Sequence, residues 1–585
     1  MTERPQGGDV TVFATRSGPV MAAWPSLRRC TLWRQLCRTV PRGSGLHTVR
    51  AGCGGESGPA LLTTPIFYVN AAPHLGHVYS ALLADVQHRY SALCGRDSRL
   101  STGTDEHGIK VQHAAAALGS DPSSFCAAVS QQFRAMFDTM AISYTDFVRT
   151  TERRHSHAVC HFWKKLEDRG YIYKGTYQGW YCTSDEAFLS EDQTLERRDG
   201  EGNICRVSAE SGHQVHWMSE ENYMFRLSLL RPKLLAWLQT EPIYPAPFLR
   251  IVQQWLEEEL PDLSVSRQRS RVSWGIPVPS DPSHTIYVWL DALINYLTVA
   301  GFPDQHFSPW GPSTHLLGKD ILRFHAIYWP AFLLAAGLPP PKKLLVHSHW
   351  TCNGVKMSKS LQNVVDPTEC IRRYTRDGLR YFLLRHGSPE RDCDFTHHTV
   401  CTLLNSELAD ALGGLLNRCT AHTINPGQCW PYYQGNNVPS AARQDLHRLL
   451  GTVRELPELV DHYMSRFQAN KALEAIDGSV RCSNAFFQSQ APWKLCKGGE
   501  DDKAWGRSVL YLTLESLRLY ATLLQPAVPD LAKTIMDRLG VPNGSRTLIG
   551  NRFFGATLGD NCCFQGQSLG SECGLLYPRL DAENK

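Results

Sequence analysis

Two short strings of polar residues, far apart in the chain, could act together on a phosphate group. The first, His74-Leu75-Gly76-His77, follows an apolar run and a turn, and it opens a predicted helix from Val78 to Tyr90. A helix N-terminus presents unpaired backbone N–H groups and a partial positive charge, so phosphate can bind there. Gly76 lets a nucleotide approach the backbone closely, and His74 and His77 can donate hydrogen bonds to phosphate oxygens.

The second string, Lys356-Met357-Ser358-Lys359-Ser360, puts two lysines on a predicted mobile loop. Two ammonium groups on such a loop can close over a triphosphate and stabilise the charge that develops during reaction. Each string alone is a weak indication, whereas the pair predicts a site that handles a nucleotide.

Four further polar strings lie at predicted strand ends or strand-to-helix junctions. They are 102–108, 287–296, 318–325 and 346–350. Because ligands of open α/β sheets bind beyond the carboxyl ends of the strands, four such positions favour one shared site. Asp105, in the first string, could hold an ammonium group, although an aspartate there could also be a helix cap.

The order of the predicted elements indicates the fold class. Short β-type runs (61–68, 99–103, 285–289, 314–317 and 343–348) alternate with helical patterns (78–94, 109–118, 290–300 and 321–336). A Gly-rich polar stretch, 175–214, interrupts them, and from about Val400 the pattern is helical to the end. We therefore expect an α/β protein with a Rossmann-like parallel-sheet catalytic domain, split by an inserted lobe and followed by an α-helical bundle.

This order gives the expected domain boundaries. They are a leader, 1–56; the first half of the catalytic domain, 57–174; an inserted lobe, 175–235; the second half, 236–355; the lysine loop with a linking segment, 356–399; and a helical domain, 400–585.

Composition is that of an ordinary globular protein. Among 585 residues, 42% are hydrophobic and the net charge is only +4, so any affinity for RNA must come from local patches. No uninterrupted apolar run approaches the roughly 20 residues of a membrane span. The 19 cysteines contain no C-x-x-C pair, which favours a reducing compartment and buried thiols.

The leader differs from the rest of the chain. Between Val10 and Gly55 there is no acidic residue and no lysine, and the basic residues are Arg16, Arg28, Arg29, Arg34, Arg38, Arg42 and Arg50. This composition, with an amphipathic pattern from Met21 to Val40, is typical of a transit peptide for the mitochondrial matrix. The alternative is a basic arm that binds RNA, and Met21 rather than Met1 could be the true start.

Several strings together resemble the methionyl-tRNA synthetases, a branch of the class I aminoacyl-tRNA synthetases, and the layout is similar to the mitochondrial form. They are 64–70, 103–108, 220–223, 288–292, 318–321, 490–493 and the histidine and lysine strings. The resemblance implies that Asp105 holds the ammonium of methionine. It implies a side-chain pocket of Ile66, Tyr68, Trp289, Ala292, Leu293, Tyr296, Ile321 and His325. It implies that ATP is bound by His74, Gly76, His77, Asp320, Lys356 and Lys359, with both histidines and both lysines catalytic.

The implied chemistry suits these residues. A thioether is unbranched and polarizable and gains from contact with aromatic rings, which Tyr68, Trp289 and Tyr296 supply, while His325 could donate to the sulfur. In the implied reaction the methionine carboxylate attacks the α-phosphorus of ATP, and the aminoacyl group then passes to the terminal ribose of tRNA(Met). No protein nucleophile is needed, so catalysis is positioning and charge stabilisation, with Mg²⁺ entering as part of the ATP substrate.

The chain departs from the family at two places. Relatives often bind zinc through C-x-x-C pairs in the lobe, but only Cys182 and Cys205 remain here, so no zinc is expected unless His213 and His216 complete a site. The family often has an Asn-x-x-x-Arg pair for the anticodon, and here Gly414 stands at the asparagine position while Arg418 is kept. Trp493 matches an aromatic on which an anticodon base stacks, with a core tryptophan as the alternative.

Two rival functions stay open at this stage. A small-molecule adenylyltransferase would use similar histidine and lysine strings but leaves the long helical segment unexplained. A catalytically silent, synthetase-derived RNA-binding protein would not need the intact strings. We expect a monomer, because the chain ends near the helical domain without an added dimerisation module.

Overall fold

The computed structural model describes most of the chain after the leader. The described residues are 60–182, 187–189, 191, 194–198, 204–209, 212–304, 313–357, 363–434, 438–548 and 564–581. The predicted leader, with both possible start residues, lies outside them, and so does Lys359.

A six-stranded sheet confirms the predicted parallel arrangement. Its order is β3-β2-β1-β14-β15-β9, and every neighbouring pair is parallel. The strands are β1 (Ala60–Tyr68), β2 (Ser98–Asp105), β3 (Asp146–Arg149), β9 (Ile243–Tyr244), β14 (Ser313–Gly318) and β15 (Lys343–His347). The chain passes outward from β1 to β3, re-enters the sheet at its opposite edge as β9, and then adds β14 beside β1 and β15 between β14 and β9. The strand order therefore reverses between β1 and β14, where the crevice of such a sheet forms.

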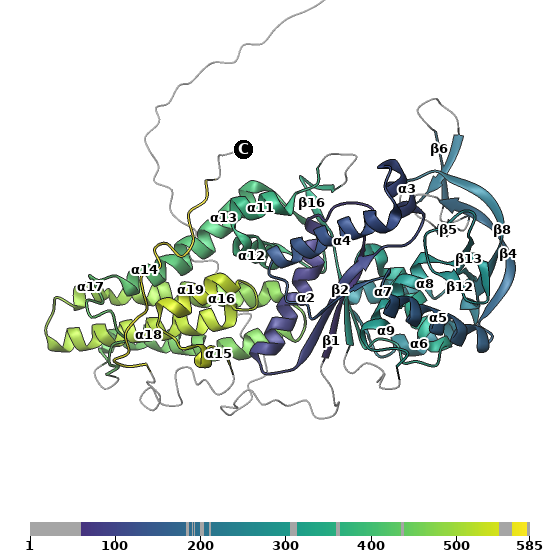
Figure 1. Ribbon diagram of the computed structural model, residues 1–585. Helices are drawn as coiled ribbons and strands as arrows, with labels where there is room; N and C mark the ends of the chain where they lie inside the picture. Colours follow the sequence, from purple (N-terminus) through teal and green to yellow (C-terminus); the bar gives the residue numbers. More distant parts are fainter. Residues whose placement is uncertain are drawn as a thin grey trace, which may run out of the picture. The chain divides into compact units, whose positions relative to one another are not determined.

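Helices cover both faces of this sheet, which is why its central strands carry almost continuous buried runs. Figure 1 shows α2 and α4 on one side of β1 and β2, with α5, α7 and α8 on the other. The helices are α2 (Leu75–Leu93), α3 (Ile109–Ala117), α4 (Pro122–Thr139), α5 (Arg153–Asp168), η2 (Leu227–Leu230), α6 (Arg231–Leu238), α7 (Ala246–Trp255), α8 (Val288–Leu293), α9 (Asn295–Val299), η3 (Lys319–Ile321), the π-turn η4 (Phe324–Tyr328) and α10 (Trp329–Ala335).

The inserted lobe and the strands that adjoin it are antiparallel. One sheet has the order β10-β8-β4-β5, and β6 and β7 form a separate hairpin. The strands are β4 (Ile172–Cys182), β5 (Ala187–Leu189), β6 (Thr194–Arg198), β7 (Ile204–Ser208), β8 (Val215–Phe225) and β10 (Leu263–Ser264).

The prediction of a strand at 285–289 in the parallel sheet was wrong, because the strand ends at Ile286 and belongs to another sheet. β13 (Asp281–Ile286) pairs antiparallel with β11 (Ser266–Gln268) and β12 (Pro277–Val278), and α8 already begins at Val288. A β-type run does not reveal its partner strand, because pairing is decided by tertiary packing.

The linking segment joins the sheet to the helical domain. Between β15 and η5 the chain forms β16 (Trp350–Cys352), β17 (Val355–Lys356), α11 (Pro367–Tyr374), α12 (Arg376–His386), β18 (Cys393–Asp394) and α13 (His397–Leu404). The helical domain contains η5 (Asn405–Gly413), α14 (Gly414–Thr420), η7 (Ser440–Ala442), α15 (Arg443–Met464), α16 (Ala469–Gln490), α17 (Pro492–Leu495), α18 (Glu500–Leu524), α19 (Pro529–Arg538) and η8 (Asn543–Ser545).

The prediction that the chain stays helical to its end was wrong. Residues 564–581 contain no helix, and in Figure 1 this yellow segment runs along the helical domain toward α13. Gly566, Gly570, Gly574 and Pro578 disfavour a helix there. The segment is held instead by side chains, since Asn405 bonds both the backbone N–H and the carbonyl of Leu580.

Two predictions, on membrane spans and on the cysteines, concern the whole chain and are compared here with the described residues. No helix among them is long and apolar enough to cross a membrane. The fourteen cysteines among them are free thiols.

Candidate active site

The two histidines of the first string cap the helix that they open. The His74 ring accepts a hydrogen bond from Gly76 N–H through Nδ1 (3.1 Å), and the His77 ring accepts one from His74 N–H through Nδ1 (3.2 Å). The rings stack, with centroids 3.6 Å apart. Because each Nδ1 accepts, a ring with a single proton carries it on Nε2. The cap therefore orients two Nε2–H donors at the positive end of α2, an arrangement suited to phosphate.

Asp105 is the last residue of β2 and pairs in register with Tyr68, the last residue of β1. Asp105 is buried, and the turn after it is clamped. The carboxylate of Glu106 accepts two hydrogen bonds from Arg149 (2.7 and 2.9 Å) and one from Thr151 (2.6 Å). These bonds hold the turn at the carboxyl end of the sheet, where the Asp105 carboxylate can meet an ammonium group.

A buried aspartate that the sequence reasoning missed ties this turn to α8. Asp291 accepts from His107 Nδ1 (2.6 Å) with one oxygen and from His155 Nε2 (2.7 Å) with the other. Burial alone would raise the pKa of Asp291, but the hydrogen bonds and charge of the two histidines lower it to about 2. An ionised Asp291 thus fixes the turn carrying Asp105 against the helix carrying Trp289. The only sequence signal was an aspartate inside an apolar helix next to predicted pocket residues.

Most residues predicted to line the side-chain pocket lie on α8, α9 and the π-turn η4. Trp289 and Ala292 lie on α8 with Leu293, and Trp289 stacks on Phe324 with centroids 3.6 Å apart. Tyr296, on α9, is buried, and its hydroxyl lies 2.7 Å from His325 Nε2. Ile66 and Tyr68 lie on β1, and Ile66 and Ile321 pack against the hydrophobic core that contains Leu293 and Tyr296.

The hydrogen bonds of His325 settle its tautomer. Its Nδ1 lies 3.0 Å from the Ile321 carbonyl, which can only accept, so Nδ1 carries the proton. Burial lowers the pKa of His325 to about 4, so at neutral pH the ring has no second proton, and Nε2 accepts from the Tyr296 hydroxyl. The expected hydrogen bond from His325 to a thioether is therefore not available in this arrangement. The ring can still contribute shape and polarizability to a pocket.

Asp320 lies just beyond β14, at the edge shared with β15. Its side chain is 58% exposed, and one oxygen is 3.4 Å from His349 Nε2. A Cβ on Gly318 would lie 2.5 Å from that same oxygen, so only glycine lets the Asp320 carboxylate fold back over the strand end.

The four polar strings meet at one edge of the sheet. Gly318 and His347 are paired across β14 and β15, and the ring of His347 bonds the hydroxyl of Ser80 on α2 (2.7 Å). The string 287–296, on α8 and α9, contacts two of the other strings. Asp291 bonds His107 of the string 102–108, and Tyr296 bonds His325 of the string 318–325. Each string is thereby joined to another by a direct side-chain or backbone contact.

The lysine loop is only partly described. Lys356 ends β17, the described backbone stops at Met357, and Lys359 lies beyond it. The root of the loop is anchored, because Asp394 accepts hydrogen bonds from the hydroxyl of Thr351 and from Gly354 N–H (both 2.8 Å). The loop therefore starts from a fixed point beside His349 and the strand end.

The two predicted anticodon residues meet around one aromatic ring. Arg418, on α14, lies over the ring of Phe487 at 5.5 Å, and that ring is 6.2 Å from the half-buried ring of Trp493. Asn484 on α16 accepts a hydrogen bond from the Arg418 guanidinium and donates to the Ala411 and Val480 carbonyls (both 3.0 Å). An amide from α16 thus contacts Arg418. In the family pattern the asparagine that accompanies this arginine stands at the position of Gly414.

The described residues contain no group of three or more His, Cys, Asp or Glu side chains that could hold a metal ion. Cys182 is buried, whereas the Cys205 thiol donates to the Arg197 carbonyl (3.3 Å) within the β6–β7 hairpin.

Family models match most of the chain. Residues 60–420 match "tRNA synthetases class I (M)", and residues 438–547 match "Anticodon binding domain of methionyl tRNA ligase". The parallel sheet and these two matches define a class I aminoacyl-tRNA synthetase.

Similar whole proteins narrow the class. The chain is 73% identical to "Methionine--tRNA ligase, mitochondrial" of Xenopus laevis over 90% of this chain and 93% of that one. It is 53% identical to the Homo sapiens protein of the same name over 92% and 94%. The Mycobacterium tuberculosis methionyl-tRNA synthetase solved in complex with methionyl-adenylate has a TM-score of 0.82 and 37% identity, over 89% of this chain and all of that one. The chain belongs to the methionyl-tRNA synthetases, in their mitochondrial branch, and its activity is that of a methionine–tRNA ligase.

Proposed function

We propose that methionine and ATP react at the edge of the sheet where the four strings meet. Asp105 holds the ammonium of methionine. Its side chain lies among Ile66, Tyr68, Trp289, Ala292, Leu293, Tyr296, Ile321 and His325. The network that joins these strings to Ser80, in the second turn of α2, is the observation that supports this assignment, because it ties the turn after Asp105 and the ends of β14 and β15 to the helix that His74 and His77 open.

ATP is bound, in this proposal, by the N-terminal end of α2 and by charged groups around it. The Nε2–H groups of His74 and His77 donate to phosphate oxygens, and Gly76 admits the nucleotide to the backbone. Asp320 contacts the nucleotide from the end of β14. Lys356 and Lys359 close over the phosphates, so the histidines and lysines are the catalytic residues.

The first step needs no protein nucleophile. The carboxylate oxygen of methionine attacks the α-phosphorus of ATP, the bond to the bridging oxygen breaks, and pyrophosphate leaves with methionyl-adenylate as the product. Mg²⁺ enters with ATP and neutralises phosphate charge. What the chain contributes is alignment and stabilisation of charge on the phosphates.

In the second step the aminoacyl group passes to a ribose hydroxyl at the 3′ end of tRNA(Met), and AMP leaves. The proposed tRNA contacts are Arg418 and Trp493, where an aromatic ring and a guanidinium can stack on an anticodon base. We assign the domains accordingly: catalytic halves 57–174 and 236–355, lobe 175–235, linking segment 356–399 and anticodon-binding domain 400–585.

Three further assignments belong to this proposal. The leader, residues 1–56, directs the protein to the mitochondrial matrix. The inserted lobe works without zinc. The protein acts as a monomer, which sedimentation of the purified protein tests directly.

Methionine-dependent exchange of pyrophosphate into ATP tests the proposal. A methionine–tRNA ligase exchanges only when methionine is present and then charges tRNA(Met). Exchange that depends on another small molecule would support the adenylyltransferase alternative. Binding of tRNA without any exchange would support the catalytically silent alternative.

A further inference from the structure

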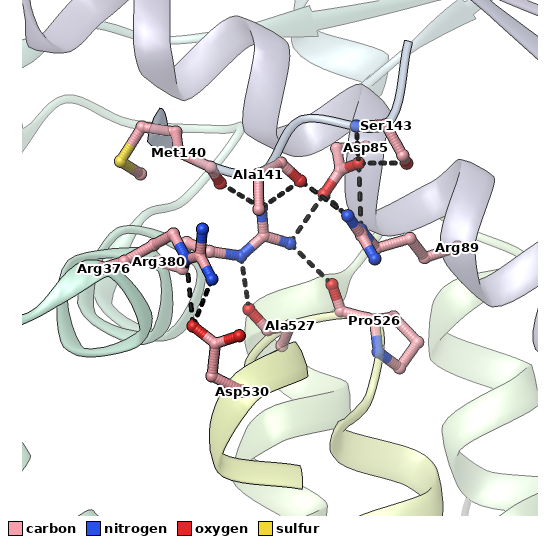
Figure 2. Close-up of polar contacts among 10 residues, drawn as sticks. All are labelled: Asp85, Arg89, Met140, Ala141, Ser143, Arg376, Arg380, Pro526, Ala527 and Asp530. Atoms are coloured by element: carbon pink, nitrogen blue, oxygen red, sulfur yellow. Dashed lines mark hydrogen bonds and ion pairs between the residues drawn. The ribbon is translucent and has the colours of Figure 1, made fainter. Parts of the chain in front are cut away.

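Arg380 joins three segments that are far apart in the sequence. It lies on α12, its side chain is fully buried, and Figure 2 shows its guanidinium at the centre of a polar network. Nη2 donates to Asp85 Oδ2 (2.6 Å) and to the Pro526 carbonyl (2.9 Å), and Nε donates to the Ala527 carbonyl (2.8 Å). Nη1 donates to the Met140 carbonyl (2.9 Å). Every nitrogen of the guanidinium is therefore used.

The three segments belong to different parts of the synthetase. Asp85 lies on α2, a little over two turns and about 12 Å along the axis from His77. Met140 caps the end of α4, which covers the same face of the sheet. Pro526 and Ala527 connect α18 to α19, inside the range that matches the anticodon-binding model. One side chain thus connects the helix of the proposed ATP site to the anticodon-binding helices.

Neighbouring contacts across the same boundary join fewer segments or are more exposed. The buried Asp377 carboxylate on α12 accepts a hydrogen bond from Leu531 N–H (2.7 Å), a bond between α12 and α19 that does not include α2. Arg376 and Asp530 form an ion pair whose side chains are 34% and 54% exposed. The Tyr90 hydroxyl donates to Asp461 (3.0 Å), whose side chain is 40% exposed. Water competes for such pairs, whereas a buried guanidinium with all its nitrogens bonded has one geometry.

We propose that Arg380 is a positioning residue for the transfer step. It sets the orientation of the anticodon-binding helices relative to α2, so that a tRNA held by its anticodon brings its 3′ end to the adenylate. This inference rests on the proposed sites for the anticodon and for ATP. The physical reason is that a small rotation at Arg380 is amplified along the tRNA, and a misplacement of about 1 Å at the reacting atoms can cost about 100-fold in rate.

The test compares two variants of Arg380 with a matched control. Arg380→Lys keeps the charge near Asp85 but cannot also span the Pro526 and Ala527 carbonyls, and Arg380→Gln removes the ion pair. The control is Arg89→Gln, because Arg89 bonds the same Asp85 carboxylate (2.9 and 3.1 Å) from α2 itself and reaches no anticodon-binding segment.

Three quantities are measured on full-length protein: methionine-dependent pyrophosphate exchange, the Kd for tRNA(Met), and single-turnover transfer from preformed methionyl-adenylate. For both Arg380 variants we expect exchange and Kd to stay within about threefold of wild type while transfer falls by about tenfold or more. Arg89→Gln should match wild type in all three.

Two outcomes would overturn the inference: wild-type transfer in a folded Arg380 variant, or exchange that falls as much as transfer. If Arg380→Gln does not fold, Arg380→Lys decides the question. Failure of the proposed function looks different, because the wild-type protein itself would then lack methionine-dependent exchange or tRNA binding.

Discussion

His107 Nδ1 lies 2.6 Å from Asp291 Oδ2, although 184 residues separate the two in the chain. This contact fixes the turn that carries Asp105 against the helix that carries Trp289. The proposed ammonium site and the proposed aromatic wall of the methionine pocket are therefore tied together by a direct hydrogen bond. Asp291 can do this because His155 holds its second oxygen at 2.7 Å.

Replacing Asp105 by asparagine keeps the shape of the side chain and removes its charge. An ammonium that loses its buried partner costs several kcal/mol, so the KM for methionine in pyrophosphate exchange should rise by about 100-fold or more. The KM for ATP should change little. An unaltered methionine KM would leave Asp105 as a structural residue of the turn.

Replacing Asp291 by asparagine should lower the melting temperature at pH 7, because two buried histidines lose a charged acceptor. Breaking such a buried pair costs about 3 kcal/mol. The methionine KM should rise while the ATP KM stays near wild type, since only the turn and α8 are released. Equal changes in both KM values would mean that the whole site had been disturbed.

The same carboxylate predicts a pH dependence. The pKa of Asp291 falls from its ordinary value near 4 to about 2 in the folded protein, so ionised Asp291 stabilises the fold fully above about pH 4. This stabilisation, about 2 kcal/mol, is lost as the pH falls through 2. Thermal melts of wild type and Asp291→Asn should therefore converge between about pH 4 and 2. A constant difference across that range would contradict the assignment.

Lys359→Ala removes a charge that we assign to the transition state of adenylation. Methionine binding, measured by equilibrium dialysis, should stay nearly intact, while the kcat of pyrophosphate exchange should collapse. Wild-type exchange rates in this variant would remove the lysine loop from the mechanism.

Trp493→Ala should weaken tRNA binding by about 1–3 kcal/mol, the range of base–aromatic stacking, with exchange in the absence of tRNA near normal. Thermal melting followed by circular dichroism is the control, because the Trp493 ring is half-buried beside Phe487. A variant that melts early and loses both activities would indicate a core role for Trp493. A stable variant that charges tRNA normally would leave Arg418 as the better anticodon candidate.

Metal analysis tests the inserted lobe. Purified protein should contain far less than one zinc per chain. A stoichiometric zinc that disappears when Cys182 and Cys205 are replaced by serine would show that the lobe keeps a metal site after all.

The chain's local patterns were enough to predict the parallel sheet, the helix at the first histidine string and the gathering of four polar strings. These depend on periodicity, helix-capping chemistry and the rule that parallel strands present their carboxyl ends at one edge, all of which operate over short stretches of chain. The departures at Gly414 and at the lobe cysteines were also visible as single residues.

Tertiary structure alone decided which distant groups meet. Nothing near Asp291 in the sequence names His107 and His155 as its partners, and nothing near Arg380 names Asp85 and the Ala527 carbonyl. The antiparallel partners of β13 and the extended path of residues 564–581 were decided in the same way. The reason is physical: a buried charge must find donors or acceptors wherever the packed chain brings them, and that choice is made by the whole fold rather than by the neighbouring residues.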